Sequence, residues 1–228
     1  DTDTMLPELA QLQQLIDTAP PQLQVELLAS IPHMAERLPL YGLQLGNRSA
    51  SVPAVVLVGG IHGLERIGTQ VVLAYLQTLL NRLPWDLCLQ HTLAHCCIYF
   101  IPLVNPAGMA NGWRANGNSV DLMRNAPVEC TEGAAWLVGG QRISRTIPWH
   151  RGRTDRMEAE NQAVADFIQR ELFNRPFSLV LDCHSGFGTT DRLWFPYAKS
   201  KRQPIAHLAE MYRLRELLFQ TYPHQNYI

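Results

Sequence analysis

The sequence predicts an α/β fold in which a mixed, mostly parallel sheet carries helices on both faces. Apolar runs of strand length alternate along the chain with segments whose apolar residues recur at helical spacing, and this alternation is typical of such sheets. Two of the runs, residues 52–58 and 177–183, are each followed closely by a histidine and by glycines that permit tight turns. Open α/β sheets bind their ligands beyond the carboxyl ends of the strands, so we expect a site at that edge.

Leucines recur at helical spacing in the first 37 residues, at Leu9 and Leu12 and again at Leu23 and Leu27, and prolines interrupt them. We expect two or three short helices, forming an N-terminal helical segment (residues 1–37) that packs on a domain of residues 38–228. Residues 38–45 and 52–58 are strand-like, and Gly46 opens the turn between them. These two strands are expected to form a β-hairpin.

The remaining elements continue the alternation. Residues 67–80 predict a helix, and residues 96–103 predict a buried strand that ends near a proline. Residues 107–154 have no sustained period, so we expect a long irregular excursion, which inside a compact domain is usually functional. Beyond it we expect a helix over residues 155–173, a strand over 177–183, a short strand over 193–195 and a last helix over 204–219.

Composition and charge exclude some classes of protein. The 228 residues carry a formal net charge of −1, so the chain has no basic field of the kind that binds nucleic acid. The longest mostly apolar stretch, residues 94–104, is too short to span a bilayer and contains Pro102. No signal-peptide pattern precedes it, which favours a cytoplasmic location, although a chain that begins at Asp1 is also compatible with a removed signal peptide.

The cysteines do not form a recognisable framework. Five of them, at positions 88, 96, 97, 130 and 183, make an odd set without the spacing of a disulfide scaffold. Reduced thiols are therefore expected. Cys96 and Cys97 are adjacent on a predicted strand and point to opposite faces, which argues against a metal site made by this pair.

Three side chains at the two strand ends predict a zinc site. His62 and Glu65 are three residues apart just after the run 52–58, and His184 follows the run 177–183. Catalytic zinc takes three protein ligands from histidine and carboxylate and keeps a further position open. Each part alone is weak, since His-x-x-Glu also occurs at surface helix caps and a histidine at a strand end is more often a hydrogen-bonded core residue. The combined placement favours the metal site.

Several motifs, in this order, resemble those of the zinc carboxypeptidase family of metallopeptidases. They are GGIHGLE (residues 59–65), NPAG (105–108), VDLMRN (120–125) and LDCHS (181–185). The resemblance covers most of residues 38–185 and implies the α/β fold of that family. It extends to the related succinylglutamate desuccinylase and aspartoacylase group, which has a similar set of motifs.

The resemblance implies that His62, Glu65 and His184 bind one zinc ion. It also implies that Asp121 orients His62, because a ligating histidine commonly donates its other N–H to a carboxylate. Asp182 lies two residues before His184 on the same strand face and is a candidate for the same task.

The substrate side of the site is implied by the same motifs. Arg114 matches the arginine that polarises the scissile carbonyl and steadies the oxyanion. Arg124, with Asn125 beside it, matches the residues that hold the terminal carboxylate of the substrate, and the planar guanidinium fork suits that task.

Two departures from the family pattern affect these expectations. Met123 stands where the family motif has an asparagine, and a methionine cannot donate a hydrogen bond to a terminal carboxylate. The glutamate that serves the family as general base is not identified, because Glu210 and Glu216 lie on the predicted last helix at ordinary surface positions. We expect that the chain lacks the late strands of the fold and that the base lies beyond Ile228.

The sequence therefore supports three functions. The first is a zinc-dependent, carboxypeptidase-like metallopeptidase that hydrolyses a peptide or amide bond. The second is a zinc-dependent deacylase of N-acyl amino acids, and the third is a catalytically silent module that binds zinc and a carboxylate. Peptides or N-acyl amino acids are the expected partners; side-chain preference and oligomeric state are left open.

Overall fold

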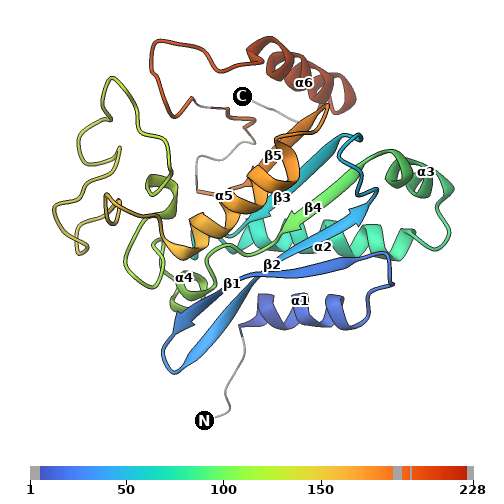
Figure 1. The fold of residues 1–228 in the computed structure, drawn as a ribbon, viewed down its shortest axis with the longest axis horizontal. Helices are drawn as coiled ribbons and strands as arrows, with labels where there is room; N and C mark the ends of the chain where they lie inside the picture. The colour runs from blue at the N-terminus through green and yellow to red at the C-terminus, as the bar shows by residue number, and fades with distance from the viewer. Residues whose placement is uncertain (1–5, 187–191, 196, 225–228) are drawn as a thin grey trace.

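The computed structural model describes residues 6–186, 192–195 and 197–224 (Figure 1). The helices are α1 (Pro7–Asp17), α2 (Arg66–Arg82), α3 (Leu87–His95), α4 (Pro106–Asn111), α5 (Ala159–Leu172) and α6 (Leu208–Thr221), with a short 3₁₀ helix η1 (Leu122–Arg124). The strands are β1 (Gln24–His33), β2 (Glu36–Gly46), β3 (Ala54–Gly59), β4 (Cys97–Ile101) and β5 (Ser178–Cys183).

The described strands form a mixed sheet in the order β1-β2-β4-β3-β5. β1 pairs with β2 and β2 with β4 in antiparallel fashion, while β3 pairs in parallel with β4 on one side and with β5 on the other. The predicted α/β class is thus confirmed. The parallel pairings lie together at the β5 side of the sheet, and Figure 1 shows helices in front of and behind it.

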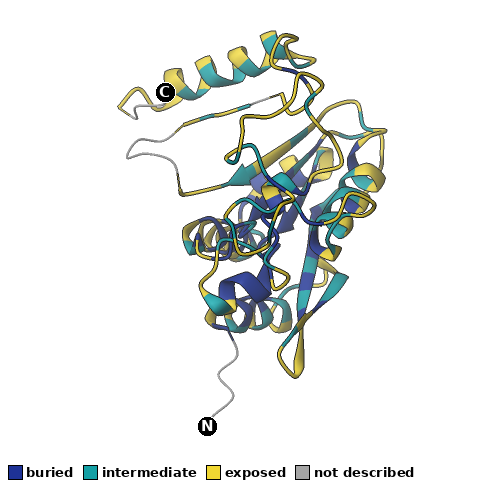
Figure 2. Cartoon of the chain, turned by 90° about the vertical axis from the view of Figure 1, so that its left-hand side faces the viewer, coloured by how far each residue is buried: buried dark blue, intermediate teal, exposed yellow. Residues whose placement is uncertain are grey.

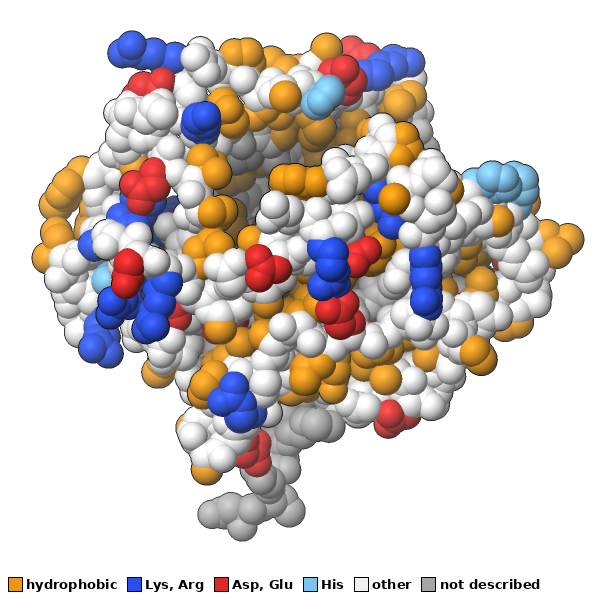
Figure 3. Space-filling view, viewed as in Figure 1, with side chains coloured by type: hydrophobic (Ala, Val, Ile, Leu, Met, Phe, Trp, Pro, Cys, Tyr) orange, Lys and Arg blue, Asp and Glu red, His pale blue; other side chains and the backbone are white. Residues whose placement is uncertain are grey.

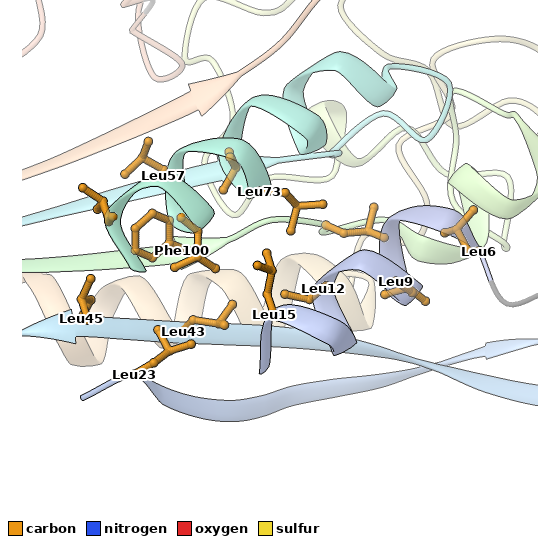
Figure 4. Packing of buried hydrophobic residues seen from close by; sticks show 14 of the residues in the cluster. Leu6, Leu9, Leu12, Leu15, Leu23, Leu43, Leu45, Leu57, Leu73 and Phe100 are labelled. Atoms are coloured by element: carbon orange, nitrogen blue, oxygen red, sulfur yellow. The ribbon is translucent and has the colours of Figure 1, made fainter. Parts of the chain in front are cut away.

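Alternating side chains of the central strands enter two hydrophobic cores, one on each face of the sheet. On one face Leu57 and Phe100 pack in a cluster with leucines of α1, α2 and α3, which Figure 4 shows from close by. On the other face Val56 and Tyr99 pack with Phe167 of α5. Both faces of β3 and β4 are therefore covered, which is why these strands read as continuous apolar runs.

Burial decreases from the middle of the sheet toward β5. Five of the six residues of β3 are buried, whereas none of the six residues of β5 is. α6 likewise has no buried residue, and Figure 2 shows it apart from the buried centre. The structure thus places β5 at an open edge of the described sheet, with the buried β3 as its neighbour.

Several sequence predictions are confirmed by individual elements. The helices expected over residues 67–80, 155–173 and 204–219 are found as α2, α5 and α6. The strands expected over residues 96–103 and 177–183 are found as β4 and β5. Within the part of the chain that the structure describes, no helix is long and apolar enough to cross a membrane.

Other predictions are wrong. In the N-terminal segment only α1 is helical, because residues 24–33 form β1 and pair along β2 across the expected boundary at residue 37. The expected hairpin of residues 38–58 does not form, since β4 lies between β2 and β3. The described residues of 193–195 form no strand, and α3 was not anticipated.

Candidate metal centre

Two neighbouring parallel strands bring the distant parts of the site together. β3 and β5 are in register up to Gly59, which lies opposite Cys183. His62 follows three residues after Gly59, and His184 follows Cys183 directly. Since both strands end at the same edge of the sheet, their histidines reach the same point.

His62, Glu65 and His184 form a group that could hold a metal ion. One ligand atom of each lies within 4.8 Å of the others. The two imidazole rings meet edge to face, with their centroids 4.9 Å apart. His62 and Glu65 are buried, whereas His184 lies at the surface, so one side of the group faces solvent. Two imidazoles and one carboxylate around an open position are the donor set of a catalytic zinc site.

Each histidine of the group has a carboxylate beside it. Asp121 lies 3.3 Å from Nε2 of His62, and Nδ1 of the same ring faces Glu65 Oε1 at 3.1 Å. Asp182 Oδ2 lies 3.0 Å from Nδ1 of His184, which leaves Nε2 of that ring free of this contact. Asp121 and Asp182 thus each contact a histidine of the group, in an arrangement that resembles the carboxylate–histidine pairs of metal sites, and their roles there stay predictions.

The two buried carboxylates are held ionised. Burial alone would raise the pKa of Glu65, but the hydrogen bonds from His62 and from the Ser185 N–H, at 2.9 Å, outweigh it and lower the pKa to about 2. Burial opposes ionisation of Asp121 in the same way, and His62 and Arg114 lower its pKa to about 2. A deprotonated Glu65 is the form in which a carboxylate ligates a metal.

The pKa of His62 shifts in the opposite direction. Burial disfavours its protonated form, but the hydrogen bonds with Asp121 and Glu65 outweigh burial and raise the pKa above its ordinary value. Nδ1 of His62 faces Glu65, so a metal ion held by these two residues would compete with a proton for this nitrogen.

Asp121 also organises the two arginines that the sequence singled out. Arg114 Nε donates to Asp121 Oδ2 at 3.0 Å, and its NH1 lies 3.5 Å from Glu65 Oε1. Arg124 NH1 lies 3.8 Å from the same Asp121 oxygen. The Nε and NH2 groups of Arg124 both donate to the carbonyl of Val138, at 3.2 and 3.1 Å.

The side chain of Asn125 makes hydrogen bonds with the segment that leads into α5. Its side-chain amide donates to the Arg151 carbonyl at 2.8 Å, and its oxygen accepts the Glu158 N–H at 2.7 Å. Its predicted role in substrate binding stays a prediction, and the contacts in the structure give it the task of fixing the loop against the start of α5.

Two close backbone approaches hold the ligand segments in place. A Cβ added to Gly68 on α2 would lie 3.0 Å from the carbonyl carbon of Cys183 and nearer still to its oxygen. Gly63, between His62 and Glu65, lies equally close to the backbone of α4 at Gly108. Glycine at these positions lets the backbones meet without a side chain between them.

Sequence reasoning missed three contributors to the site: the Ser185 N–H on Glu65, the Val138 carbonyl on Arg124, and the tight contact at Gly68. Backbone groups leave no signal of residue type, so the first two could not be found. Gly68 was visible as a glycine inside a helical pattern, where a packing reason is usual.

Fold and site together define the class of protein: an α/β domain with a group of side chains that could hold a metal ion at the carboxyl ends of neighbouring parallel strands. A family model described as zinc carboxypeptidase matches residues 14–226. The chain belongs to this family.

Individual relatives agree with the assignment. The chain is 30% identical over 181 residues to carboxypeptidase E of Caenorhabditis elegans, covering 72% of this chain and 37% of that protein. It is 26% identical over 107 residues to carboxypeptidase SOL1 of Arabidopsis thaliana, covering 46% of this chain and 22% of that protein. The solved structure of thrombin activatable fibrinolysis inhibitor superposes with a TM-score of 0.75 at 21% identity, covering 97% of this chain and 57% of that chain. The similarity thus spans well under half the length of the two curated relatives.

Proposed function

We propose that this chain forms the zinc-binding part of a carboxypeptidase-like metallopeptidase, with His62, Glu65 and His184 as the ligands of one zinc ion. The observation that carries the proposal is the convergence of these three side chains within 4.8 Å, together with the carboxylate contacts of both histidines. Membership of the zinc carboxypeptidase family supports the choice of metal.

The residues present fit a catalytic zinc ion. The donors are the types that zinc prefers, Glu65 is ionised, and the surface position of His184 leaves an approach from solvent. Bound zinc supplies a Lewis acid for a carbonyl and lowers the pKa of a coordinated water.

Arg114 is suited to the charge that develops during amide hydrolysis. Its guanidinium is anchored by Asp121, and NH1 lies 3.5 Å from a proposed zinc ligand, so it holds a fixed cation beside the reacting position. Such a preorganised donor stabilises an oxyanion without reorganisation during the reaction.

Arg124 is the proposed anchor for the substrate carboxylate. Its guanidinium reaches Asp121 on one side and donates two hydrogen bonds to a neutral carbonyl on the other. A carboxylate accepts such paired hydrogen bonds more strongly than a carbonyl does, because the bonds are charge-assisted. With Met123 beside it, we expect Arg124 to bear most of the carboxylate recognition alone.

The two glutamates of α6, Glu210 and Glu216, are not suited to act as the general base. On the exposed α6, Glu210 lies 3.5 Å from His207 at the N-cap and Glu216 lies 3.0 Å from Arg213, so neither glutamate belongs to the metal group. Loss of general acid-base catalysis costs on the order of 100 to 10,000 fold in rate, so zinc binding is a sharper first test of the proposal than turnover.

The test is zinc content measured by elemental analysis of the purified protein and of its His62→Ala and His184→Ala variants. We expect near-stoichiometric zinc in the unaltered protein and loss in both variants. His207→Ala, which removes an exposed histidine of α6, is the matched control and should keep its zinc. Absence of zinc from the folded, unaltered protein would refute the proposal.

A deacylase of N-acyl amino acids is the second candidate. It is favoured by Met123, which removes an amide from the expected carboxylate site. The match to the zinc carboxypeptidase family favours the peptidase. Activity on a panel of peptides and N-acyl amino acids separates the two, and zinc binding without activity on either would favour a silent binding module.

A further inference from the structure

A pair of histidines on α3 lies far from the metal group. His91 and His95 are four residues apart, both are exposed, and their ring centroids are 4.5 Å apart. Residues at this spacing lie one above the other on a helix. Figure 3 shows a histidine surface on the side of the molecule where Figure 1 places α3. We propose that His91 and His95 form a second site, which binds a divalent transition-metal ion at the surface.

The hydrogen bonding of His95 leaves a nitrogen suited to a metal. Its Nδ1 lies 2.8 Å from the carbonyl oxygen of His91, and a carbonyl can only accept, so Nδ1 carries the hydrogen. In the neutral ring Nε2 is then the nitrogen with a free electron pair. A histidine that donates one N–H to a backbone carbonyl and offers the other nitrogen is the usual arrangement of a metal ligand.

The helix that carries the pair is fixed at both ends. At its start the side chain of Asp86 accepts the Leu89 N–H at 3.0 Å. At its end the Asn47 N–H donates to the carbonyls of Leu93 and Cys96, at 2.8 and 2.9 Å, and the Asn47 side chain donates to Ala94 at 2.8 Å. The buried face of α3 is anchored by Leu89 and Leu93. The backbone that carries the two imidazoles is thus fixed before any ion arrives, which reduces the entropy lost on binding.

The donor chemistry selects the class of metal. Imidazole suits copper, nickel and zinc, and affinity among these follows the order in which copper binds most tightly. Both rings lie in the last two turns of α3, where the negative end of the helix dipole favours a cation. α3 leads into the start of β4, at the amino ends of the parallel strands, whereas the first metal group lies beyond the carboxyl ends of β3 and β5, so the two sites are at opposite ends of the sheet.

The test is a calorimetric titration of the protein with Ni²⁺ alone, comparing the unaltered chain with His91→Ala and His95→Ala. All three contain His62, Glu65 and His184, so metal bound there cancels in the comparison. We expect the unaltered chain to bind one more equivalent than either variant, and this equivalent to bind on the order of 100 fold more tightly than at a single remaining imidazole. Added Ni²⁺ should also raise the melting temperature of the unaltered chain more than that of either variant, since each ligand bound to the folded state stabilises it.

A control variant tests whether nickel binding depends on the spacing of the two histidines and not only on the number of histidines in the chain. The double variant Gln90→His with His91→Ala keeps eight histidines but places two of them five residues apart, about 140° around the helix. It should lose the additional equivalent, whereas Cys88→Ser, which removes the exposed thiol one turn before His91, should keep it. Equal nickel binding by the unaltered chain and the histidine variants, or loss of the equivalent in Cys88→Ser, would overturn the assignment to the two imidazoles.

Discussion

Gly68→Ala is the substitution that most directly tests how the fold builds the metal group. Gly68 is buried in the first turn of α2, three residues after Glu65. A methyl group there would lie 3.0 Å from the carbonyl carbon of Cys183 and closer to its oxygen, so α2 and β5 must move apart. Because His184 follows Cys183 directly, this separation also moves His184 away from His62.

Two opposing effects decide the sign of the stability change. Alanine is a better helix former than glycine by about 1 kcal/mol, which would stabilise α2. Overpacking a well-packed contact costs about 1–3 kcal/mol, and here the obstacle is backbone, which cannot rotate away. Because the obstacle is rigid, we take the upper part of this range and expect a net loss of about 1–2 kcal/mol in the free energy of unfolding, whereas helix propensity alone would give a gain.

The metal site should be affected more than the stability. Metal–ligand distances vary by only about 0.2 Å, and a shift of β5 on the order of 1 Å exceeds that tolerance. By analogy with the loss of orienting groups around a metal, we expect zinc affinity to fall by about 10 to 100 fold. The free energy of unfolding is measured by urea denaturation, and the zinc affinity by competition with a coloured chelator.

Gln70→Ala is the matched control, because Gln70 is exposed on the same helix and the change should alter stability by about 0.5 kcal/mol or less. A Gly68→Ala protein that is as stable as the unaltered one, with the same zinc affinity, would show that the contact between α2 and Cys183 does not set the ligand geometry.

Three further predictions use the same measurements or simple kinetics. Asp121→Asn should weaken zinc by about 10 to 100 fold, because it removes the charge that orients His62; unchanged affinity would contradict that role. Arg124→Lys should raise KM about tenfold for peptides with a free carboxyl terminus and leave amidated peptides unaffected, since the paired hydrogen bonds are lost. Burial raises the pKa of Glu160, so its contribution to stability is fully present below the ordinary pKa of 4.5 and is lost as the pH rises through the higher folded pKa. Glu160→Gln should remove this decline in urea unfolding between pH 4 and 8, and an unchanged decline would assign it to other groups.

The parts of the fold that the sequence predicts are those in which local pattern and tertiary packing agree. β3 and β4 are buried on both faces, so their apolar runs are unambiguous. The helical period of residues 67–80 corresponds to a real apolar face, because Val72, Leu76 and Leu79 are buried in α2. His62 and Glu65 are close in sequence, and His184 joins them through ordinary parallel pairing, so the proximity of these three side chains could also be predicted.

The errors arise where pairing overrides local pattern. Leu23, Leu27 and Leu28 have helical spacing, yet Leu27 is 57% exposed and the segment is fixed by its hydrogen bonds to β2. The turn after β2 does not lead to a hairpin, because the Asn47 N–H bonds to Leu93 and Cys96. These hydrogen bonds hold Asn47 beside the end of α3. The chain therefore leaves free the position next to β2, which β4 occupies. Neither partner is adjacent in sequence, so no local signal records the choice.

The hydrogen bonds from Arg124 to the Val138 carbonyl also join residues that are not adjacent in sequence, and they bear on substrate binding. The carbonyl accepts both hydrogen bonds of the guanidinium edge that a substrate carboxylate would use. A bond to a carboxylate is roughly twice as strong as one to a neutral carbonyl, so exchange is favourable when the carboxylate arrives already desolvated. For a substrate without a free carboxylate the same exchange gains little, and the loop keeps its contact. Selectivity for a terminal carboxylate can therefore arise from competition with the loop, even though Met123 supplies no hydrogen bond.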